Sequence, residues 1–431
     1  MWNEVQWIKI PDMKLRNKQI LHGDLGGRFA YFRLEQELPA DARLTARITA
    51  VSRYRLWVND QAVLSGSCKG DLNRQYYETV SLTPYLHAGK NVFAVQVLYN
   101  DPDIARDQTD ERAAIYGVVG AGNCHALAID GDITDAFGRV IGTISTGKAL
   151  WRVWLDHTFY LKSSEYTVYL GATEESVDAR RSPLEWKRLD FDASSWSLAC
   201  ASGPVMPSAL FQSVGLIPRV HLMPREIPLM EETECAFARV IRRKNDLVLD
   251  AGVEVNGYPR FSFNGNAGTE ITVTYLERFG NGADGARIDD MGGTVEGRAD
   301  HIILNGHLVN YEPFWVRTFR YIVVKSSDGK LPEMPAAQVY RKTGYPLSVE
   351  STVDSSTPWV GQLWGICLRT LQNCMLETYM DCPYYEQLQF IMDTRLQMLF
   401  TYAVSRDARL AKKALLDFHC GMRPEGLLPG K

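Results

Sequence analysis

The sequence lacks the cysteine and histidine patterns that mark disulfide scaffolds and metal centres. Its eight cysteines are scattered, no pair has Cys-x-x-Cys spacing, and a chain of 431 residues is too long to depend on disulfides for its fold. His419 and Cys420 are adjacent, rather than separated by the spacing that zinc ligands need. We therefore expect no metal site and no cofactor, and the sequence leaves open whether calcium supports the fold.

The chain also lacks an apolar leader, a membrane-spanning run and a strong net charge. Its first residues, Met-Trp-Asn-Glu-Val-Gln-Trp, have neither the basic segment nor the apolar segment of a signal peptide, and no apolar run approaches the length of a membrane span. A net charge of −4 gives no general affinity for the phosphate backbone of nucleic acids. We expect neither nucleic-acid nor membrane partners. We also expect a cytoplasmic location for the chain as given, or a periplasmic or secreted one if its natural N-terminus lies upstream.

The length and the hydrophobic content of 45% predict a soluble globular protein of two or three domains. Residues 1–213 contain short runs rich in β-branched, leucine and aromatic residues, which turn residues separate at regular intervals. This pattern predicts a β-sandwich. The runs that carry it are 29–34, 44–50, 54–59, 92–99, 126–129 and 140–145.

A second β region is predicted from residue 214 to residue 345. Five prolines between residues 204 and 228 interrupt regular structure, so we place the boundary near residue 213. In residues 271–275 apolar side chains alternate with threonines, as in a half-buried strand. Residues 281–297 are rich in glycine and acidic residues and predict a long loop.

After Pro346 the hydrophobic periodicity changes from two to about 3.6, which predicts helices. Pro358 suits the first turn of a helix, and three hydroxyl residues before it are candidate caps: Ser355, Ser356 and Thr357. The apolar stripe of this helix consists of Val360, Leu363, Trp364, Cys367 and Leu371. A later helix is predicted from about residue 407 to residue 419, ending near Gly421.

Between these helices, residues 378–393 concentrate carboxylates at a predicted helix entrance. Pro383 suits the first turn, and Asp381 is the better of the two candidate caps. Glu386 and Asp393 are seven residues apart, so on one helix they share a face with a separation of about 10.5 Å along the axis. The three carboxylates can then face one cavity. Spacing alone is equally consistent with a simple cap and an acidic first turn.

The pattern Asp-Cys-Pro-x-x-Glu, followed by an Asp seven residues after the Glu, resembles the signature of bacterial α-L-rhamnosidases, glycoside hydrolase family seventy-eight. The resemblance implies that this segment opens a helix of an (α/α)6 toroid, a six-hairpin glycosidase domain. It also implies that Glu386 is the general acid and that Asp381 and Asp393 bind the rhamnose hydroxyls. In this family the general base lies late in the toroid, beyond Lys431, so no residue here is assigned to it.

The sequence departs from the family pattern at two positions of this segment. Tyr385 stands where many members have Arg, which affects how the acid is oriented, and Met392 stands where many have Gly, which narrows the cavity. Tyr384 and Tyr385 are candidate substrate-binding residues, and together with Phe390 they can exclude water from the acid.

The resemblance extends over nearly the whole chain. Residues 31–33, 54–59 and 86–91 resemble the jelly-roll module that precedes the catalytic domain of rhamnosidases. A further set of motifs resembles the concanavalin-like β-sandwich before the toroid: Asp250-Ala-Gly, Gly268-Thr-Glu, Tyr275-Leu-Glu, Tyr311-Glu-Pro and Phe319-Arg-Tyr. We therefore expect a multidomain chain in which the jelly-roll-like domain of residues 1–213 is a candidate carbohydrate-binding module. The concanavalin-like domain follows at 214–345, and the start of the toroid at 346–431.

Three helices cannot close six hairpins, and uncovered apolar faces cost about 25 cal/mol per Å². We therefore expect a fragment or a shortened catalytic domain, whose segments after Pro346 are disordered, covered in a homodimer or completed by missing sequence.

Four aromatic or acidic residues outside the toroid allow two interpretations each. Trp57 and Trp151 are candidates for stacking on a sugar ring, but both also suit a β-sandwich core, and Trp57 lies in a predicted strand. Glu277 and Glu312 could be mistaken for a pair of catalytic carboxylates. The resemblance instead implies that they make hydrogen bonds or salt links between strands. Trp186 and Trp196 fit the family's connecting segment and are predicted to be structural.

The resemblance implies a full-length protein that releases terminal L-rhamnose from α-L-rhamnosides with inversion, acting on rhamnose-containing glycosides or polysaccharides. The 431 residues alone are then expected to be inactive or weakly active. Two alternatives stay open: a glycosidase of the same toroid that acts on another sugar, and a carbohydrate-binding β module without chemistry.

Overall fold

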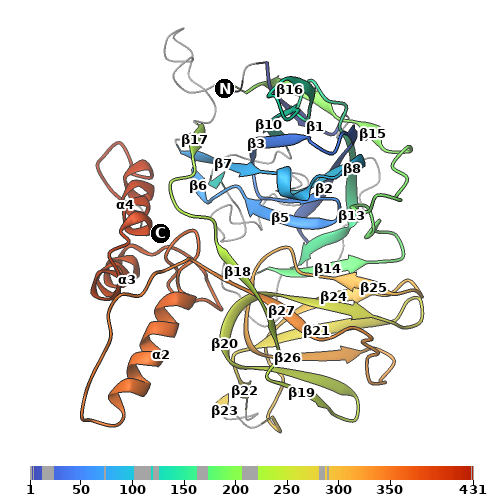
Figure 1. Cartoon of the computed structure of the whole chain (residues 1–431). Coiled ribbons are helices and arrows are strands. Elements are labelled where there is room, and N and C mark those ends of the chain that lie inside the picture. Colours follow the sequence, from blue (N-terminus) through green and yellow to red (C-terminus); the bar gives the residue numbers. More distant parts are fainter. Residues whose placement is uncertain are drawn as a thin grey trace. The chain divides into compact units, whose positions relative to one another are not determined.

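A computed structural model describes most of the chain (Figure 1). The described residues are 2, 4–11, 24–71, 74–100, 118–119, 126–162, 173–205, 222–280, 287–288, 291–428 and 430. The chain divides into two compact units. The first unit consists of Met1–Arg112, Tyr116–Lys162 and Ser182–Arg225, and the second of Ala113–Ile115, Ser163–Arg181 and Glu226–Lys431. The predicted boundary near residue 213 lies outside the described residues.

The described part of the first unit is built almost wholly from strands. One sheet has the order β12-β11-β3-β10-β1-β16, with β7 on β3 and β17 on β7. These strands are β1 (Gln6–Lys9), β3 (Arg43–Ala50), β7 (Gln75–Ser81), β10 (Leu127–Asp130), β11 (Asp132–Thr134), β12 (Val140–Thr143), β16 (Cys200–Pro204) and β17 (Leu222–Pro224). In a second sheet β13, β2, β8, β4 and β5 follow one another, and β15 pairs with β13. These are β2 (Asp24–Leu38), β4 (Tyr54–Val58), β5 (Gln61–Gly66), β8 (Gly89–Asn100), β13 (Arg152–Lys162) and β15 (Ser197–Leu198).

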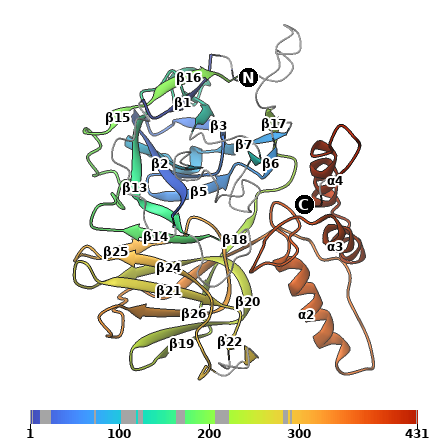
Figure 2. The same cartoon turned by 180° about the vertical axis from the view of Figure 1, so that it is seen from behind.

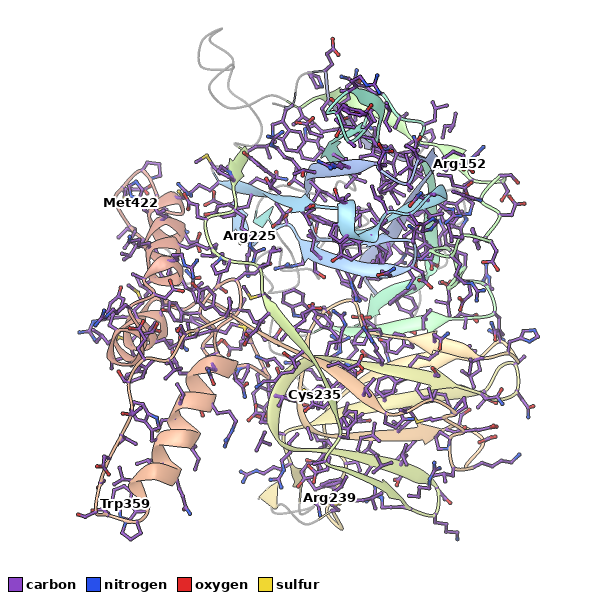
Figure 3. The ribbon with its side chains drawn as sticks, viewed as in Figure 1. Arg152, Arg225, Cys235, Arg239, Trp359 and Met422 are labelled. Carbon is purple, nitrogen blue, oxygen red and sulfur yellow. The ribbon has the colours of Figure 1, made fainter. Side chains whose placement is uncertain are left out.

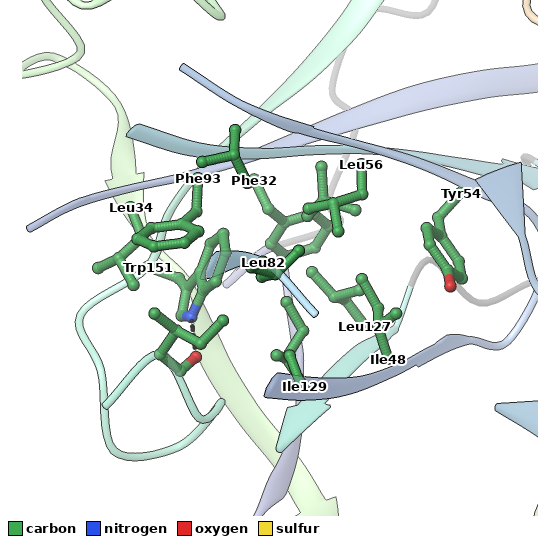
Figure 4. Close-up of a cluster of buried hydrophobic side chains, with 14 of the residues drawn as sticks. Phe32, Leu34, Ile48, Tyr54, Leu56, Leu82, Phe93, Leu127, Ile129 and Trp151 are labelled. Atoms are coloured by element: carbon green, nitrogen blue, oxygen red, sulfur yellow. Dashed lines mark hydrogen bonds between the residues drawn. The ribbon is translucent and has the colours of Figure 1, made fainter. Parts of the chain in front are cut away.

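The two sheets of the first unit enclose a large apolar core, as the alternation of the sequence predicts. Trp151 lies in this core among Phe32, Leu34 and Phe93 (Figure 4). Its side chain is 1% exposed, and its indole N–H donates a hydrogen bond of 2.9 Å to the carbonyl oxygen of Ile144. The indole therefore satisfies its one polar group inside the sandwich, and the β-sandwich predicted for this part of the chain is confirmed.

The strands of the second unit form one antiparallel run, β18-β27-β20-β26-β21-β24, to which β14 adds in parallel to β24. β19 and β25 also pair with the long strand β20. The strands are β14 (Glu174–Asp178), β18 (Glu231–Ala236), β19 (Arg239–Arg242), β20 (Asp246–Phe263), β21 (Glu270–Leu276), β24 (Arg298–Ile303), β25 (Val309–Tyr311), β26 (Arg317–Ser326) and β27 (Val339–Gly344). The loop predicted at 281–297 contains a short strand, β23 (Arg287–Ile288), which pairs with β22 (Phe279–Gly280).

Three helices follow the strands of the second unit: α2 (Val360–Asn373), α3 (Ile391–Val404) and α4 (Arg409–Cys420). In both views α3 lies beside α4 (Figures 1 and 2), and it contacts α2 as well. The predicted helices after Pro358 and near residues 407–419 are confirmed, although no side chain caps the start of α2. None of the described helices is both long enough and apolar enough to cross a membrane.

The apolar stripe predicted for α2 is largely uncovered in this chain. Leu371 is buried, whereas Leu363 and Cys367 are exposed. Trp359, immediately before the helix, is 60% exposed (Figure 3). Exposed apolar side chains continue on α3, where Leu399 and Phe400 face solvent. The helices thus present the uncovered surfaces that the sequence predicts.

The strand β20 carries a bulge that places a carboxyl group in an unusual environment. Its pairing with β26 shifts register between Asp250 and Val255. Glu254 lies in this bulge, and its Oε1 is enclosed without a hydrogen-bond partner among the described residues. Burial raises the pKa of Glu254 to about 7, the charge of Glu277 acts in the same direction, and that of Arg369 opposes it.

We expect Trp151→Ala to lower the free energy of unfolding by about 3–5 kcal/mol, because it empties a filled core site and removes a satisfied hydrogen bond. Urea denaturation followed by circular dichroism measures this change. Phe137→Ala is the control, since Phe137 is 84% exposed, and it is expected to change the free energy by less than about 0.5 kcal/mol. Equal effects of the two substitutions would contradict the core position of Trp151.

We expect Glu254→Gln to stabilise the protein in a pH-dependent way. The pKa of Glu254 is about 7 when folded, against an ordinary value of 4.5. Ionisation of Glu254 therefore destabilises the folded protein. This destabilisation is absent at pH values below the ordinary pKa and complete above the pKa of the folded state. The melting temperature of the Gln variant minus that of wild type should rise between pH 4 and pH 8. The exposed Glu333→Gln should give a flat difference, and a flat difference for Glu254→Gln would refute the expectation.

Candidate active site

The carboxylates singled out in the sequence lie on a closed loop, which we call the acid loop (residues 381–388). The predicted helix from Pro383 is wrong, because residues 383–386 form only a turn and α3 does not begin until Ile391. Gln387 ends the turn with a φ of +55°, in the left-handed region. The separation of Glu386 and Asp393 along one helix axis is therefore also wrong.

Asp381 closes the acid loop instead of capping a helix. Its backbone N–H donates a hydrogen bond of 2.9 Å to the carbonyl oxygen of Leu388. The backbone N–H of Leu388 in turn donates to Asp381 Oδ1 at 3.0 Å. An aspartate that satisfies a backbone N–H is as suited to a turn as to a helix cap, so the residue type alone does not separate the two.

Glu386 lies at the end of this turn with a half-buried side chain. Its backbone N–H donates to Cys382 Sγ at 3.4 Å. Burial raises the pKa of that thiol to about 11, so it stays protonated at neutral pH. The carboxyl group of Glu386 is thus neither in bulk solvent nor sealed in the core, which is the position that a group exchanging protons with a ligand requires.

Asp381 and Asp393 act on the same buried thiol, Cys374. Burial raises the pKa of Cys374 to about 12, and the negative charges of Asp381, Glu254 and Asp393 contribute in the same direction. The three carboxylates are therefore within electrostatic range of one point. Asp393 itself is exposed in the first turn of α3, where the helix dipole favours a negative charge. Asp381, Asp393 and Glu254 of β20 thus share an electrostatic influence on Cys374, and no local motif gives a signal for Glu254.

The two tyrosines of the acid loop differ in what they offer a ligand. Tyr384 is 3% exposed, and its hydroxyl donates to the carbonyl oxygen of Tyr275 at 2.7 Å while accepting from the backbone N–H of Arg298 at 3.2 Å. The ring of Tyr385 lies edge-on against that of Tyr384 and is half-buried. The hydroxyl of Tyr384 is therefore engaged with backbone, and only Tyr385 keeps part of its ring accessible.

The tryptophans predicted as stacking candidates belong to the first unit and are both covered. Trp57 is buried with its ring edge-on against Trp186, and the Nζ of Lys187 lies 4.9 Å from the centre of its ring. Trp151 lies in the core described above. The packing alternative therefore describes the positions of both residues, and stacking on a sugar finds no exposed ring at either. Trp186 and Trp196 are also buried, within an aromatic group around Tyr31.

The first unit does contain a hollow of about 780 Å³. Its lining combines apolar and charged side chains, among them Leu150, Phe191, Glu35 and Lys90. Glu35 is paired with Lys90 at 3.0 Å and with Arg33 at 2.7 Å. Carbohydrate binding by this unit stays a prediction.

The rival carboxylates of the second β region have structural surroundings. Glu312 accepts hydrogen bonds from Arg260 at 3.0 Å and from Arg341 at 2.6 Å, which link β20 to β27. The salt link predicted for Glu312 is therefore confirmed. Glu277 contributes charge to the environment of Glu254. Within the described ranges, no group of three or more His, Cys, Asp or Glu side chains is arranged to hold a metal ion.

Two family models match the second unit. Residues 241–340 match the bacterial alpha-L-rhamnosidase concanavalin-like domain, and residues 348–431 match the bacterial alpha-L-rhamnosidase 6 hairpin glycosidase domain. The second match contains the acid loop and all three helices. No curated protein matches the chain.

Several solved structures share the fold of the chain. The GH78 family rhamnosidase of Bacillus sp. GL1 aligns with a TM-score of 0.71 and 15% identity over 96% of this chain and 62% of its own. The alpha-L-rhamnosidase of Streptomyces avermitilis, complexed with L-rhamnose, aligns with a TM-score of 0.69 and 19% identity over 94% of this chain and 37% of its own. The alpha-L-rhamnosidase of Dictyoglumus thermophilum aligns with a TM-score of 0.71 and 17% identity over 100% of this chain and 46% of its own.

The chain therefore spans between 37% and 62% of the length of these enzymes. At these identities the alignments establish a common fold. The second unit thus carries the concanavalin-like domain and the beginning of the six-hairpin glycosidase domain of bacterial α-L-rhamnosidases.

Proposed function

We propose that the whole protein to which these residues belong is a glycoside hydrolase that releases terminal L-rhamnose from α-L-rhamnosides. One observation carries the proposal: within the segment that matches the six-hairpin glycosidase domain, Glu386 is half-buried on the acid loop, which the hydrogen bond from Leu388 to Asp381 closes. The rhamnose of the Streptomyces avermitilis complex is consistent with this substrate class. Rhamnose-containing glycosides or polysaccharides are then the substrates.

In the proposed mechanism Glu386 protonates the glycosidic oxygen of the departing group. Glu386 is itself half-buried, and it follows the buried Tyr384 and the half-buried Tyr385 in the chain. Asp381 and Asp393 accept hydrogen bonds from sugar hydroxyls, because ionised carboxylates are acceptors only. An inverting enzyme needs a second carboxylate about 6.5–9.5 Å from the acid, with a water between the base and the sugar. We assign no residue of this chain to that base.

We expect Glu386→Gln in the whole protein to lower kcat by about 10²–10⁴-fold on rhamnosides with alkyl or sugar leaving groups, because a general acid contributes that much to the rate. An activated aryl rhamnoside, whose leaving group needs little protonation, should lose much less. Steady-state kinetics on both substrate types measures the difference. The exposed Glu333→Gln serves as the control and should retain wild-type turnover. Near-normal kcat of Glu386→Gln on the alkyl rhamnoside would overturn the assignment.

A panel of aryl glycosides tests the sugar. We expect the α-L-rhamnoside to have the highest kcat/KM, because Asp381 and Asp393 are proposed to hold its hydroxyls. A higher value for another sugar would favour a different six-hairpin glycosidase. Sugar binding with no turnover of any panel member would favour a carbohydrate-binding module without chemistry.

A further inference from the structure

The acid loop is held from outside the glycosidase domain, by side chains of the concanavalin-like sandwich. Thr318 on β26 places its Oγ1 2.6 Å from the carbonyl oxygen of Pro383. Arg298 on β24 donates from its guanidinium to the carbonyl oxygen of Tyr385. Trp315, just before β26, donates from its indole N–H to Oε1 of Gln387 at 2.8 Å. Each contact reaches a different residue of the loop, so together they fix its path on both sides of Glu386.

The contact to Gln387 bears most directly on the acid. Gln387 follows Glu386, is 3% exposed and holds a left-handed backbone, which costs a non-glycine residue about 1–2 kcal/mol. Its side chain is fixed at both ends, since Oε1 accepts from Trp315 and Nε2 donates to the carbonyl oxygen of Pro383 at 2.7 Å. These bonds hold the backbone turn that sets the direction in which Glu386 leaves the chain.

Trp315 is itself anchored by buried charge. Glu175 on β14 accepts hydrogen bonds from the backbone N–H groups of Phe314 at 2.9 Å and Trp315 at 3.1 Å. Arg317 pairs with Glu175 at 2.9 Å and with Asp300 at 2.7 Å, and all three charged side chains are buried. The segment that carries the indole is therefore tied to the sandwich through its backbone, so the indole is a rigid support for the loop.

Arg298 supplies a positive charge beside the same loop. Its guanidinium carbon lies 5.1 Å from the centre of the Tyr384 ring, and the residue is buried. Burial lowers its pKa to about 10, which still leaves it charged at neutral pH. The backbone carbonyl that it binds belongs to Tyr385, directly before Glu386. The residues on both sides of the acid are thus held by the sandwich.

We propose that Trp315 and Arg298 of the concanavalin-like sandwich are positioning residues for Glu386. Through them the sandwich orients the side chain of the general acid. This inference rests on the proposed function, because it assigns to Glu386 the proton transfer argued above. A misplacement of about 1 Å at a reacting group can cost 10²-fold in rate. Loss of either contact should therefore reduce kcat, while substrate affinity, which depends on Asp381 and Asp393, changes little.

The first test uses the whole protein and three variants measured with an alkyl α-L-rhamnoside. Trp315→Phe keeps an aromatic ring, although a smaller one, and removes the N–H donor, and Arg298→Lys keeps the charge but removes the planar fork. Each is expected to lower kcat about 10- to 100-fold with KM changed less than about threefold. Trp2→Phe is the matched control, because Trp2 is buried and its Nε1 has no partner among the described residues. It should leave kcat unchanged.

A double-mutant cycle separates positioning from general damage to the fold. In a Glu386→Gln background, Trp315→Phe should have no further effect on kcat, because both changes remove the same proton transfer. If Trp315→Phe lowers kcat equally with and without Glu386, the positioning role is refuted. If Glu386→Gln lowers kcat while Trp315→Phe and Arg298→Lys do not, positioning fails and the acid assignment stands. If Glu386→Gln is itself fully active, the proposed function fails first.

Gln387→Gly tests whether kcat falls in a variant that stays folded. Glycine adopts the left-handed backbone without strain, so the variant is expected to melt within about 3 °C of wild type even though its two side-chain bonds are lost. Because those bonds no longer fix the turn, kcat should fall about 10-fold or more. Wild-type kcat in a stably folded Gln387→Gly would show that the side chain does not aim the acid.

Discussion

The hydrogen bond between the Trp315 indole and the Gln387 side chain is the constraint on which the candidate site depends. It crosses from a β-sandwich to a loop of the glycosidase domain, and it ends on the residue beside Glu386. Behind it, the buried carboxylate of Glu175 binds the backbone of Trp315, and Arg317 compensates that carboxylate. A buried charge is costly unless it is paired, so this arrangement tolerates little movement. The strands therefore add external contacts to the hydrogen bonds that the loop makes within itself, from Leu388 to Asp381 and from Gln387 to Pro383.

The sequence predicts best where one local signal dominates. A 3.6-residue period behind Pro358 predicts α2, and the period that ends near Gly421 predicts α4; both helices lie within two or three residues of the expected bounds. The helix predicted at Pro383 fails because Asp381, Pro383 and Glu386 serve a tight turn as well as a first helical turn. Contacts with Tyr275, Arg298 and Trp315, all distant in sequence, decide between the two.

The candidate site was predictable only in part for the same reason. Asp381, Glu386 and Asp393 share one short segment, so their spacing and the family signature reveal them together. Glu254 and Arg298 come from strands far away in the sequence, and nothing in their neighbourhood distinguishes them from other charged strand residues. The burial that raises the pKa of Glu254 and lowers that of Arg298 exists only once the chain has folded. Trp151 illustrates the converse, since an indole suited to a sugar face is equally suited to a sandwich core.

The uncovered faces of α2 and α3 affect how this polypeptide behaves in a test tube. These faces expose leucine, isoleucine and aromatic side chains to water. Two such apolar surfaces from neighbouring molecules can associate and bury each other. The chain should therefore self-associate in solution as its concentration rises. Dilution and cold both weaken that adhesion, because apolar association relies on the entropy of released water.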